Sequence, residues 1–426
     1  MSADMVIMPS AISGSLEAIP SKSACHRLAI AASLLSGKSL LSGLQTGDDV
    51  KKTLCALEAL LRAKIVKAED SGFISAEITG KAPIMQSERV VDCGESGSTL
   101  RMLLPLALDG CGLVRFIGHG RLMQRPMKPY EELCERHGFE YIKSGDSISV
   151  CGKLASGEYS MRGDVSSQFL SGMAFALSAI GSSRLVIEGR LESAPYLEMT
   201  LDTLTRCGAD IRLAGNAIEF GSPDFISGIS AKAEGDWSHA AFALVMGALG
   251  GSAEVCGLDI SSRQGDKRIA EILRECGADV SVSGGKVRAK RAGLLKPFEV
   301  DASDIPDLVP ILSVLACGII GRSRIFGAKR LREKESDRLA AMAGELNALG
   351  AAVSETEDGL VIDGSGSLLG GKCSSHNDHR VAMSLCAASA VSKGAIALSG
   401  WEAVSKSAPR FFDEFRRLGG IANAGQ

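Results

Sequence analysis

The 426-residue chain lacks several features that would assign it to a class at once. Its formal net charge is only −3, so it has no bulk positive charge for binding nucleic acid or an anionic membrane. Its longest apolar run, Leu308–Ile320, falls short of the roughly 20 residues that a transmembrane helix needs. Small anionic ligands are not excluded, because they need only a local cluster of positive side chains.

The cysteines and the N-terminus exclude further classes. The 12 cysteines are scattered, with no CxxC pair, and the sequence contains no HExxH motif. This distribution predicts reduced, buried thiols in a cytoplasmic protein, without a disulfide framework or a metal site. The first residues, 1–15, have neither the basic nor the apolar region of a signal peptide, so we expect none.

What the sequence does contain is a sixfold internal repeat. Six similar amphipathic segments end at Ala63, Gly138, Gly208, Gly277, Gly350 and Gly419, in steps of 75, 70, 69, 73 and 69 residues. Each repeat is predicted to run β-α-β-α-β-β, with a buried, almost wholly apolar first helix and an outer, charged second helix. The repeats therefore predict an α/β fold of two domains, each with three repeats around a pseudo-threefold axis and the apolar helices inside.

The sixth repeat is cut short, because little sequence follows Gly419. The segments Met5–Met8 and Ile12–Ala18 look like its missing closing strands. We therefore expect one discontinuous domain, residues 1–19 with 235–426, and one inserted domain, residues 20–234. A hinge is expected at about residues 19–20 and 234–236. The alternative is two sequential domains with a mobile N-terminal tail.

Polar clusters stand at the starts of the buried helices. The free N–H groups and the positive dipole end of a helix favour an anion there. Pseudo-symmetry would direct several of these helix starts from both domains toward one cleft. The clusters contain Lys22, Ser23 and Arg27; Gly94–Ser98; Arg121 and Arg125; Ser166, Ser167 and Gln168; Ser193 and Tyr196; Lys334 and Arg338; Asp378 and Arg380; and Lys406. Each cluster alone also fits a helix cap, a surface loop or a solvated charged helix.

Two carboxylates accompany these cations. Asp307 follows Asp304, a good N-cap, and lies inside the first turn of an apolar helix, where it needs a partner or a chemical role. Glu335 lies beside Lys334 and Arg338. The excess of cations predicts ligands with several negative charges, held by charge-assisted hydrogen bonds worth about 1.5–3 kcal/mol each.

Taken in order, the motifs resemble those of the 5-enolpyruvylshikimate-3-phosphate (EPSP) synthase family, the 3-phosphoshikimate 1-carboxyvinyltransferases. They are SKSxxxR at 21–27, SGxxLR at 96–101, RxxxRP at 121–126, SSQ at 166–168, SxPY at 193–196, IPD at 305–307, KExDR at 334–338, NDHR at 377–380 and SK at 405–406. The resemblance runs the full length of the chain. It implies a two-domain inverse α/β barrel-like fold of six repeats. It also implies transfer of the enolpyruvyl group of phosphoenolpyruvate to the 5-hydroxyl of shikimate-3-phosphate, without a cofactor.

The resemblance also implies roles for individual residues. Asp307 would be the general base, Glu335 the leading candidate for the acid, and Lys22 would contact both substrates. Shikimate-3-phosphate would be bound by Lys22, Ser23, Arg27, Ser166, Ser167, Gln168, Ser193, Tyr196, Asp307, Arg330 and Lys334. Phosphoenolpyruvate would be bound by Lys22, Gly97, Arg121, Gln168, Arg338, Arg380 and Lys406.

The sequence departs from the family pattern at three points. Glu95 stands where the family usually carries Asn, and Arg330 stands where many members have an Asn that contacts the acceptor. The loop before Arg121 is shorter than usual, so Arg125 is an alternative to Arg121. Gly97 is retained, which predicts room for glyphosate.

Three other functions compete with this interpretation. The sister enolpyruvyl transferase for UDP-N-acetylglucosamine resembles a protein with a Cys in its mobile loop, whereas His119–Pro129 contains none. An enzyme like RNA 3′-phosphate cyclase would need a nucleotide-linking histidine and a basic face. A non-catalytic repeat scaffold would not need Asp307 in an apolar turn. We expect a cytoplasmic monomer that acts on small molecules and binds neither nucleic acid nor membrane.

Overall fold

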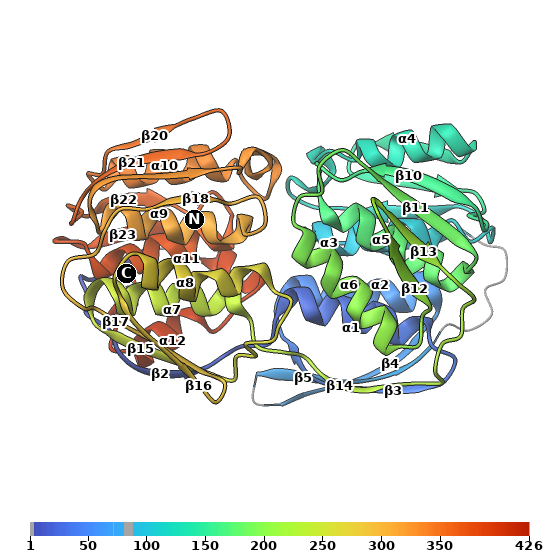
Figure 1. Ribbon diagram of the computed structural model, residues 1–426, viewed down its shortest axis with the longest axis horizontal. Coiled ribbons are helices and arrows are strands. Elements are labelled where there is room, and N and C mark those ends of the chain that lie inside the picture. Colours follow the sequence, from blue (N-terminus) through green and yellow to red (C-terminus); the bar gives the residue numbers. More distant parts are fainter. Residues whose placement is uncertain (1–3, 71, 81–87, 426) are drawn as a thin grey trace. The chain divides into compact units, whose positions relative to one another are not determined.

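The structure, a computed structural model, describes residues 4–70, 72–80 and 88–425. The chain divides into two compact units, Lys22–Ala233 and the combination of Met1–Ser21 with Glu234–Gln426 (Figure 1). Where the chain leaves and re-enters the discontinuous unit, the Ser21 N–H donates to the Glu234 carbonyl oxygen at 2.7 Å, and Pro20 bridges Gly235.

The Lys22–Ala233 unit holds the first three repeats. Its helices are α1 (Lys22–Leu34), α2 (Asp48–Leu61), α3 (Gly97–Leu103), α4 (Lys128–His137), α5 (Ser167–Ile180) and α6 (Ala194–Arg206). Its strands are β3 (Lys38–Gln45), β4 (Lys64–Asp70), β5 (Phe73–Thr79), β6 (Arg89–Asp92), β7 (Val114–Ile117), β8 (Glu140–Ser144), β9 (Ser147–Cys151), β10 (Glu158–Arg162), β11 (Ser183–Glu188), β12 (Ile211–Ala214), β13 (Ala217–Phe220) and β14 (Ser230–Lys232). They form sheets of order β14-β3-β5-β4, β6-β7-β9-β8 and β10-β11-β13-β12.

The other unit holds repeats four to six and the N-terminal strands. Its helices are α7 (Trp237–Gly250), α8 (Ile269–Glu275), α9 (Val309–Cys317), α10 (Arg338–Ala348), α11 (His379–Ala387) and α12 (Phe411–Arg417). Its strands are β1 (Met5–Ile7), β2 (Ser13–Glu17), β15 (Ser252–Cys256), β16 (Asp279–Ser283), β17 (Lys286–Lys290), β18 (Glu299–Asp301), β19 (Ile320–Phe326), β20 (Val353–Glu355), β21 (Leu360–Ser365), β22 (Gly371–Ser374), β23 (Ile396–Ser399) and β24 (Ala422–Ala424). The sheets have the order β16-β17-β15-β2, β18-β19-β21-β20 and β22-β23-β1-β24.

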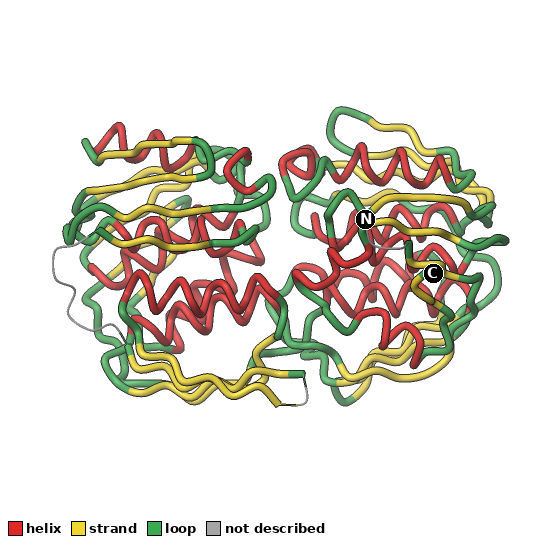
Figure 2. Tube along the Cα trace, turned by 180° about the vertical axis from the view of Figure 1, so that it is seen from behind, coloured by secondary structure: helices red, strands yellow, loops and turns green. Residues whose placement is uncertain are grey.

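All six sheets share one topology. The first strand of a repeat is parallel to the second, the second is antiparallel to the fourth, and the fourth is antiparallel to the third, as β18, β19, β21 and β20 illustrate. This pattern confirms the predicted β-α-β-α-β-β repeat and the α/β fold class. In each unit the strands lie outside and the first helices of the repeats lie within (Figure 2).

The N-terminal strands differ from the prediction. β1 does serve the sixth repeat, as its fourth strand between β23 and β24, but the third strand is β24, which lies in the short C-terminal segment itself. β2 instead runs parallel to β15, as the first strand of the fourth repeat. In the same way β14 runs parallel to β3 as the first strand of the first repeat. The first and fourth repeats therefore take their first strands from distant parts of the sequence.

Apolar first helices fill both cores. Along α7 and α9 nearly every residue is buried, including Trp237, Phe242 and Leu312. Such helices bury their whole circumference because sheets and neighbouring helices surround them. The second helices, such as α2 and α6, bury one face and expose charged residues on the other. The sequence predicted this division between inner and outer helices.

Side-chain caps start several inner helices. Ser96, Ser166, Asp236 and Asp378 accept hydrogen bonds from the first-turn N–H groups of α3, α5, α7 and α11. The prediction that Asp304 caps its helix is wrong. Pro306 opens a 3-10 turn, η4 (Pro306–Leu308), before α9, and Ile305 is the residue that precedes it, because proline favours the first helical position. No helix among the described residues is long and apolar enough to cross a membrane.

Candidate active site

Arg338 is the centre of a charged cluster in the discontinuous unit. It is the first residue of α10, and its side chain is only 2% exposed. Its Nε donates to Asp378 Oδ2 at 2.8 Å, its Nη1 to Asp307 Oδ1 at 2.9 Å and its Nη2 to Glu335 Oε2 at 2.7 Å. Burial alone would lower the pKa of Arg338, but the three carboxylates hold it above its ordinary value. Arg338 is therefore a permanent cation.

Asp307 lies between two guanidinium groups. Its Oδ2 accepts from Arg380 Nη2 at 2.9 Å, while its Oδ1 accepts from Arg338. Arg380 is in the first turn of α11, 73 residues from Asp307 in sequence. The sequence predicted all three residues as functional, and the fold brings them together because the starts of η4, α10 and α11 converge.

Lys334 supplies a second kind of cation beside Asp307. Within the described part of the chain, its ammonium group makes no hydrogen bond or ion pair. Burial lowers the pKa of Lys334 to about 7, against an opposing effect of Asp307. Arg330, in the 3-10 turn η5 (Lys329–Glu333), donates to the backbone carbonyl of Ser303. The cluster therefore contains one cation whose charge depends on what binds near it.

Lys406 extends the cluster toward the segment before α11. It ends the 3-10 helix η7 (Trp401–Lys406) and is buried, and its Nζ donates to the carbonyl oxygen of Asn377 at 2.6 Å. The next residue, Asp378, accepts from Arg338 and, at 3.1 Å, from the hydroxyl of Ser336. Asp378 is completely buried, so it fixes the position of Arg338 and faces no ligand directly.

Arg27 is the buried centre of a cluster in the Lys22–Ala233 unit. Its Nε donates to Thr200 Oγ1 at 2.8 Å, its Nη1 to the Ser23 carbonyl at 2.8 Å and its Nη2 to the Tyr196 carbonyl at 2.7 Å. The guanidinium also lies 6.0 Å from the centre of the Tyr196 ring. These contacts join α1 to α6, so the predicted residues Ser23, Arg27 and Tyr196 lie in one cluster.

Gly97, Gln168 and two arginines form a second cluster in this unit. Arg101 Nη1 donates to Gln168 Oε1 at 3.1 Å, and Gln168 Nε2 donates to Ser98 Oγ at 2.9 Å. A Cβ atom on Gly97 would lie 2.8 Å from Arg125 Nη1. Arg125 is buried, and its guanidinium group lies beside Gly97.

Arg121 and Glu95 lie in two different loops, after β7 and after β6. Arg121 is exposed, and its guanidinium group forms no hydrogen bond or ion pair with the residues that the structure describes. Gly120 lies against Glu95, since a Cβ atom there would come within 2.8 Å of the Glu95 carboxylate. The two arginines therefore differ in exposure: Arg121 is exposed and Arg125 is buried.

The remaining predicted residues also lie at helix starts. Lys22 forms an ion pair with Asp49 at 3.0 Å, Ser166 caps α5, and Ser167 is buried in the first turn of α5. Ser193 precedes α6 in a left-handed conformation, with φ of 55°. These side chains stand where backbone N–H groups of a helix are available to an anion.

Two functional candidates escaped the sequence analysis. Arg101 lies within the quoted SGxxLR motif, but nothing indicated that it would contact Gln168, 67 residues away. Asp266 is a fully buried carboxyl group that accepts from the hydroxyl of Ser238. Burial and the neighbouring Asp307 raise the pKa of Asp266 to about 7. Its sequence context is an ordinary polar loop, which gave no signal.

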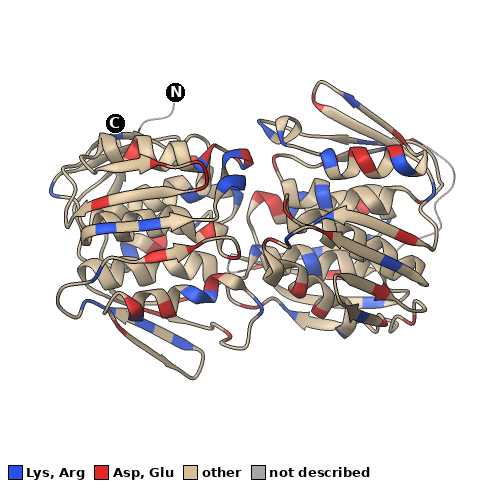
Figure 3. Cartoon of the chain, turned by 45° about the horizontal axis from the view of Figure 1, so that its top comes forward, with Lys and Arg blue, Asp and Glu red and all other residues tan. Residues whose placement is uncertain are grey.

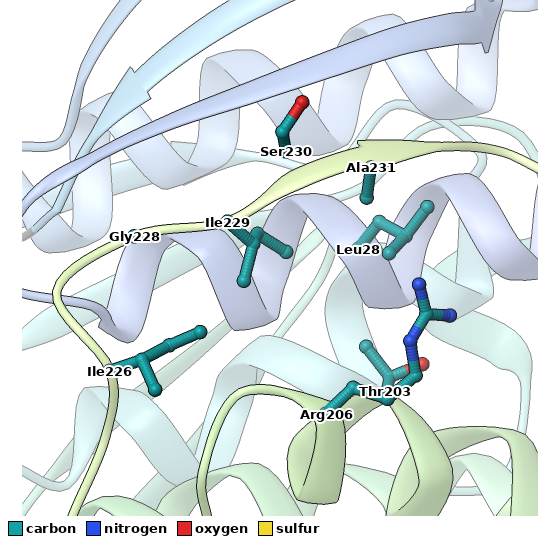
Figure 4. Close-up of a pocket in the computed structure, with 8 residues that line it drawn as sticks. All are labelled: Leu28, Thr203, Arg206, Ile226, Gly228, Ile229, Ser230 and Ala231. Carbon is teal, nitrogen blue, oxygen red and sulfur yellow. The ribbon is translucent and has the colours of Figure 1, made fainter.

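A pocket of about 270 Å³ lies elsewhere in the Lys22–Ala233 unit, between α1, α6 and the segment that leads into β14 (Figure 4). Aliphatic and polar residues both line it: Leu28, Thr203, Arg206, Ile226, Gly228, Ile229, Ser230 and Ala231. None of the predicted site residues is among them. In Figure 3 basic and acidic residues are interspersed along both units.

The fold and the two sets of clusters agree with one class of enzyme, the enolpyruvyl transferases. A sequence profile described as EPSP synthase (3-phosphoshikimate 1-carboxyvinyltransferase) matches residues 6–415. The chain belongs to this family.

Individual relatives agree with the family assignment. The chain is 39% identical over 424 residues to a 3-phosphoshikimate 1-carboxyvinyltransferase of Clostridium perfringens, covering 98% of both chains. It is 40% identical to the enzyme of the same name from Clostridioides difficile, covering 97% of both. Among solved structures, EPSP synthase from Acinetobacter baumannii matches all of both chains with a TM-score of 0.81 and 25% identity. An enolpyruvyl transferase from Streptomyces tendae, 16% identical, shares the fold with a TM-score of 0.75, covering 99% of this chain and 98% of the other.

Proposed function

We propose that the chain transfers the enolpyruvyl group of phosphoenolpyruvate to the 5-hydroxyl of shikimate-3-phosphate and releases phosphate. The observation that carries the proposal is the carboxylate of Asp307, which two buried arginines hold at 2.9 Å each. A pair of guanidinium groups suits an anionic donor such as phosphoenolpyruvate. When phosphoenolpyruvate binds both arginines, the carboxylate of Asp307 would become available as the base for the hydroxyl of shikimate-3-phosphate.

The donor is assigned to the arginines and to the glycine at the start of α3. Arg338, Arg380 and Lys406 would bind the carboxylate and phosphate of phosphoenolpyruvate, with Lys22 and Gln168 contacting both substrates. At Gly97 two arginines of the following loop, Arg121 and Arg125, are candidates. The buried position of Arg125 against Gly97 supports Arg125.

The acceptor is assigned mainly to hydroxyl and amide side chains. Ser23, Arg27, Ser166, Ser167, Gln168, Ser193 and Tyr196 would hold shikimate-3-phosphate, with Asp307, Arg330 and Lys334 near its hydroxyl groups. Hydrogen bonds from Arg and helix N–H groups to phosphate are charge-assisted and direction-specific. Arg330 replaces an amide that is common in the family, and its existing bond to the Ser303 carbonyl limits its reach toward a ligand.

The chemistry requires one base and one acid. Asp307 would take the proton of the acceptor hydroxyl as its oxygen attacks the vinyl carbon, while Glu335 would protonate the methylene group. Phosphate then leaves from the tetrahedral intermediate, and the methyl group loses a proton. Each acid–base group typically contributes about 10²–10⁴-fold. Closure about the proposed hinge near residues 19–20 and 234–236 would exclude water.

The sister transferase for UDP-N-acetylglucosamine is not favoured. The loop His119–Pro129 has no cysteine, and the curated relatives named above carry the shikimate name. We further propose a cytoplasmic monomer that needs no cofactor and binds no nucleic acid. The twelve cysteines are all free thiols, which supports a reducing compartment.

An assay of phosphate release separates the candidate functions. The purified chain is given phosphoenolpyruvate with shikimate-3-phosphate, and in parallel with UDP-N-acetylglucosamine. We expect release only with the first acceptor. Release only with the UDP-sugar, or with neither, would contradict the proposal.

Two substitutions test the proposed acid and base. Asp307→Ala and Glu335→Gln should each lower kcat by at least 100-fold, the lower bound of about 10² for such groups. Circular dichroism and gel filtration should show an intact fold in both variants. A kcat within tenfold of the wild-type value would refute the role of the residue concerned.

A further inference from the structure

The segment just before α11 makes an unusual backbone turn. His376 and Asn377 both have left-handed conformations, with φ of 51° and 56°, and neither is a glycine. Non-glycine residues pay a steric cost in this region, and two in succession cost more. The turn must therefore be held in place by its surroundings.

This turn positions two groups of the Arg338 cluster. The carbonyl oxygen of Asn377 accepts from Lys406 Nζ at 2.6 Å. The residue that follows, Asp378, caps α11 and accepts from Arg338 Nε at 2.8 Å. A shift of the turn would therefore move the anchor points of two cations that we assign to phosphoenolpyruvate.

Glu345 contacts the segment from the side of α10. Its Oε2 accepts from the Ser374 N–H at 3.0 Å, and its Oε1 lies 2.6 Å from Nε2 of His376. The Glu345 side chain is 15% exposed, so it is well placed for strong hydrogen bonds. Two side-chain oxygens thus hold the strand end and the first residue of the left-handed turn together.

Arg338 and Glu345 lie on the same side of α10. They are seven residues apart, which is close to two helical turns. Arg338 contacts the segment at Asp378 and Glu345 contacts it at Ser374 and His376. Side chains of α10 therefore contact the segment on both sides of the turn. The helix itself lies beside β22 (Figure 1).

We propose that Glu345 is a positioning residue for donor binding, which acts by holding the His376–Asn377 turn and, through it, Lys406 and Arg338. The inference rests on the proposed function, because it assigns these two cations to phosphoenolpyruvate. Glu345 itself contacts no substrate in this scheme. Its loss should weaken donor binding and spare acceptor binding, which depends largely on the other unit.

The kinetic test compares Glu345→Ala with Glu345→Gln and a control. Glu345→Ala should raise KM for phosphoenolpyruvate at least fivefold, with KM for shikimate-3-phosphate within twofold of wild type. In Glu345→Gln the amide oxygen can still accept from the Ser374 N–H, and the NH₂ group can donate to Nε2 of a neutral His376, so KM should lie within twofold of wild type. The control, Glu275→Ala, removes the ion pair of Glu275 with Arg268 at the end of α8 and should change neither KM.

A double variant separates positioning from a general loss of stability. Glycine adopts positive φ without steric cost, so His376→Gly lets the turn form with less support. In Glu345→Ala/His376→Gly, KM for phosphoenolpyruvate should fall at least threefold from the Glu345→Ala value. An unchanged KM in Glu345→Ala, or no recovery in the double variant, would overturn the proposal.

Hydrogen exchange tests the turn even without activity. Glu345→Ala should speed amide exchange in a peptide covering residues 374–380 at least tenfold, and Glu275→Ala should not. Unchanged exchange would overturn the positioning role whatever the activity. If wild-type protein instead releases no phosphate while exchange responds as expected, the proposed function fails and the role of Glu345 in the turn stands.

Discussion

Asp378→Asn tests whether the buried ion pair holds the discontinuous unit together. Asp378 is completely buried, and Oδ2 accepts from Arg338 Nε and Ser336 Oγ, while Oδ1 accepts from the Arg380 N–H at 2.9 Å. Both oxygens therefore face N–H donors. An asparagine amide must direct its NH₂ group at one of them, whichever way it is turned.

The expected loss of stability follows from these contacts. Breaking a buried ion pair by removing one partner costs about 3–5 kcal/mol, because a charge is left without its counterion. Arg338 keeps Asp307 and Glu335 as partners, so the expected loss of stability lies near the lower end of that range. We therefore expect Asp378→Asn to lower the free energy of unfolding of this unit by about 3 kcal/mol.

Urea unfolding followed by tryptophan fluorescence measures this loss selectively. The two tryptophans, Trp237 and Trp401, both lie in the discontinuous unit, so their signal follows the unit that contains Asp378. The control is Asp363→Asn, which removes an equally short but exposed pair with Arg322. Exposed pairs are worth about 0–1 kcal/mol. Equal losses in the two variants, within about 0.5 kcal/mol, would refute the reasoning.

Three further outcomes are expected. The pKa of Lys334 is about 7 in the folded chain, against an ordinary value of 10.5 for an unfolded chain. Between pH 7 and pH 10.5 the unfolded chain therefore binds more protons than the folded chain. The free energy of unfolding should therefore rise from pH 7 to 9 more steeply in wild type than in Lys334→Met, as measured by urea unfolding. The KM for phosphoenolpyruvate of Arg125→Ala should be at least ten times that of Arg121→Ala. Equal KM values in the two variants would contradict the preference for Arg125. Gly97→Ala places a Cβ atom 2.8 Å from Arg125 Nη1, so KM for phosphoenolpyruvate and the half-inhibitory concentration of glyphosate should both rise at least fivefold in steady-state assays.

The fold was predictable where the pattern repeats locally. Apolar inner helices and amphipathic outer helices follow from residue periodicity, which is a property of neighbouring residues. The partners of β1, β2 and β24 were not predictable in the same way. These strands are three to five residues long, and their pairing is decided by segments hundreds of residues away. The error over β2 and β24 follows from that distance.

The candidate site divides along similar lines. The caps Ser166 and Asp378 and the first-turn residues Asp307 and Arg380 carry local signals, since helix starts have characteristic side chains. Asp304 was misjudged because Pro306 shifted the helix start by its own geometry. Arg101, Asp266 and Glu345 gave no local signal. Gln168, the partner of Arg101, lies in another repeat, Ser238 lies 28 residues before Asp266, and Glu345 contacts a turn whose left-handed conformation is not evident from the sequence.

The pairing of β1 between β23 and β24 has a consequence for the order of folding during synthesis. Residues Lys22–Ala233 contain every strand of their own sheets, so this unit can close once β14 has left the ribosome. β1 and β2 are translated before this unit but stay unpaired until later strands emerge, β15 for β2 and β23 with β24 for β1. Until then they are unpaired strand edges, and these invite wrong pairing. Two strands that are translated before the inserted unit thus find their partners only after that unit is complete.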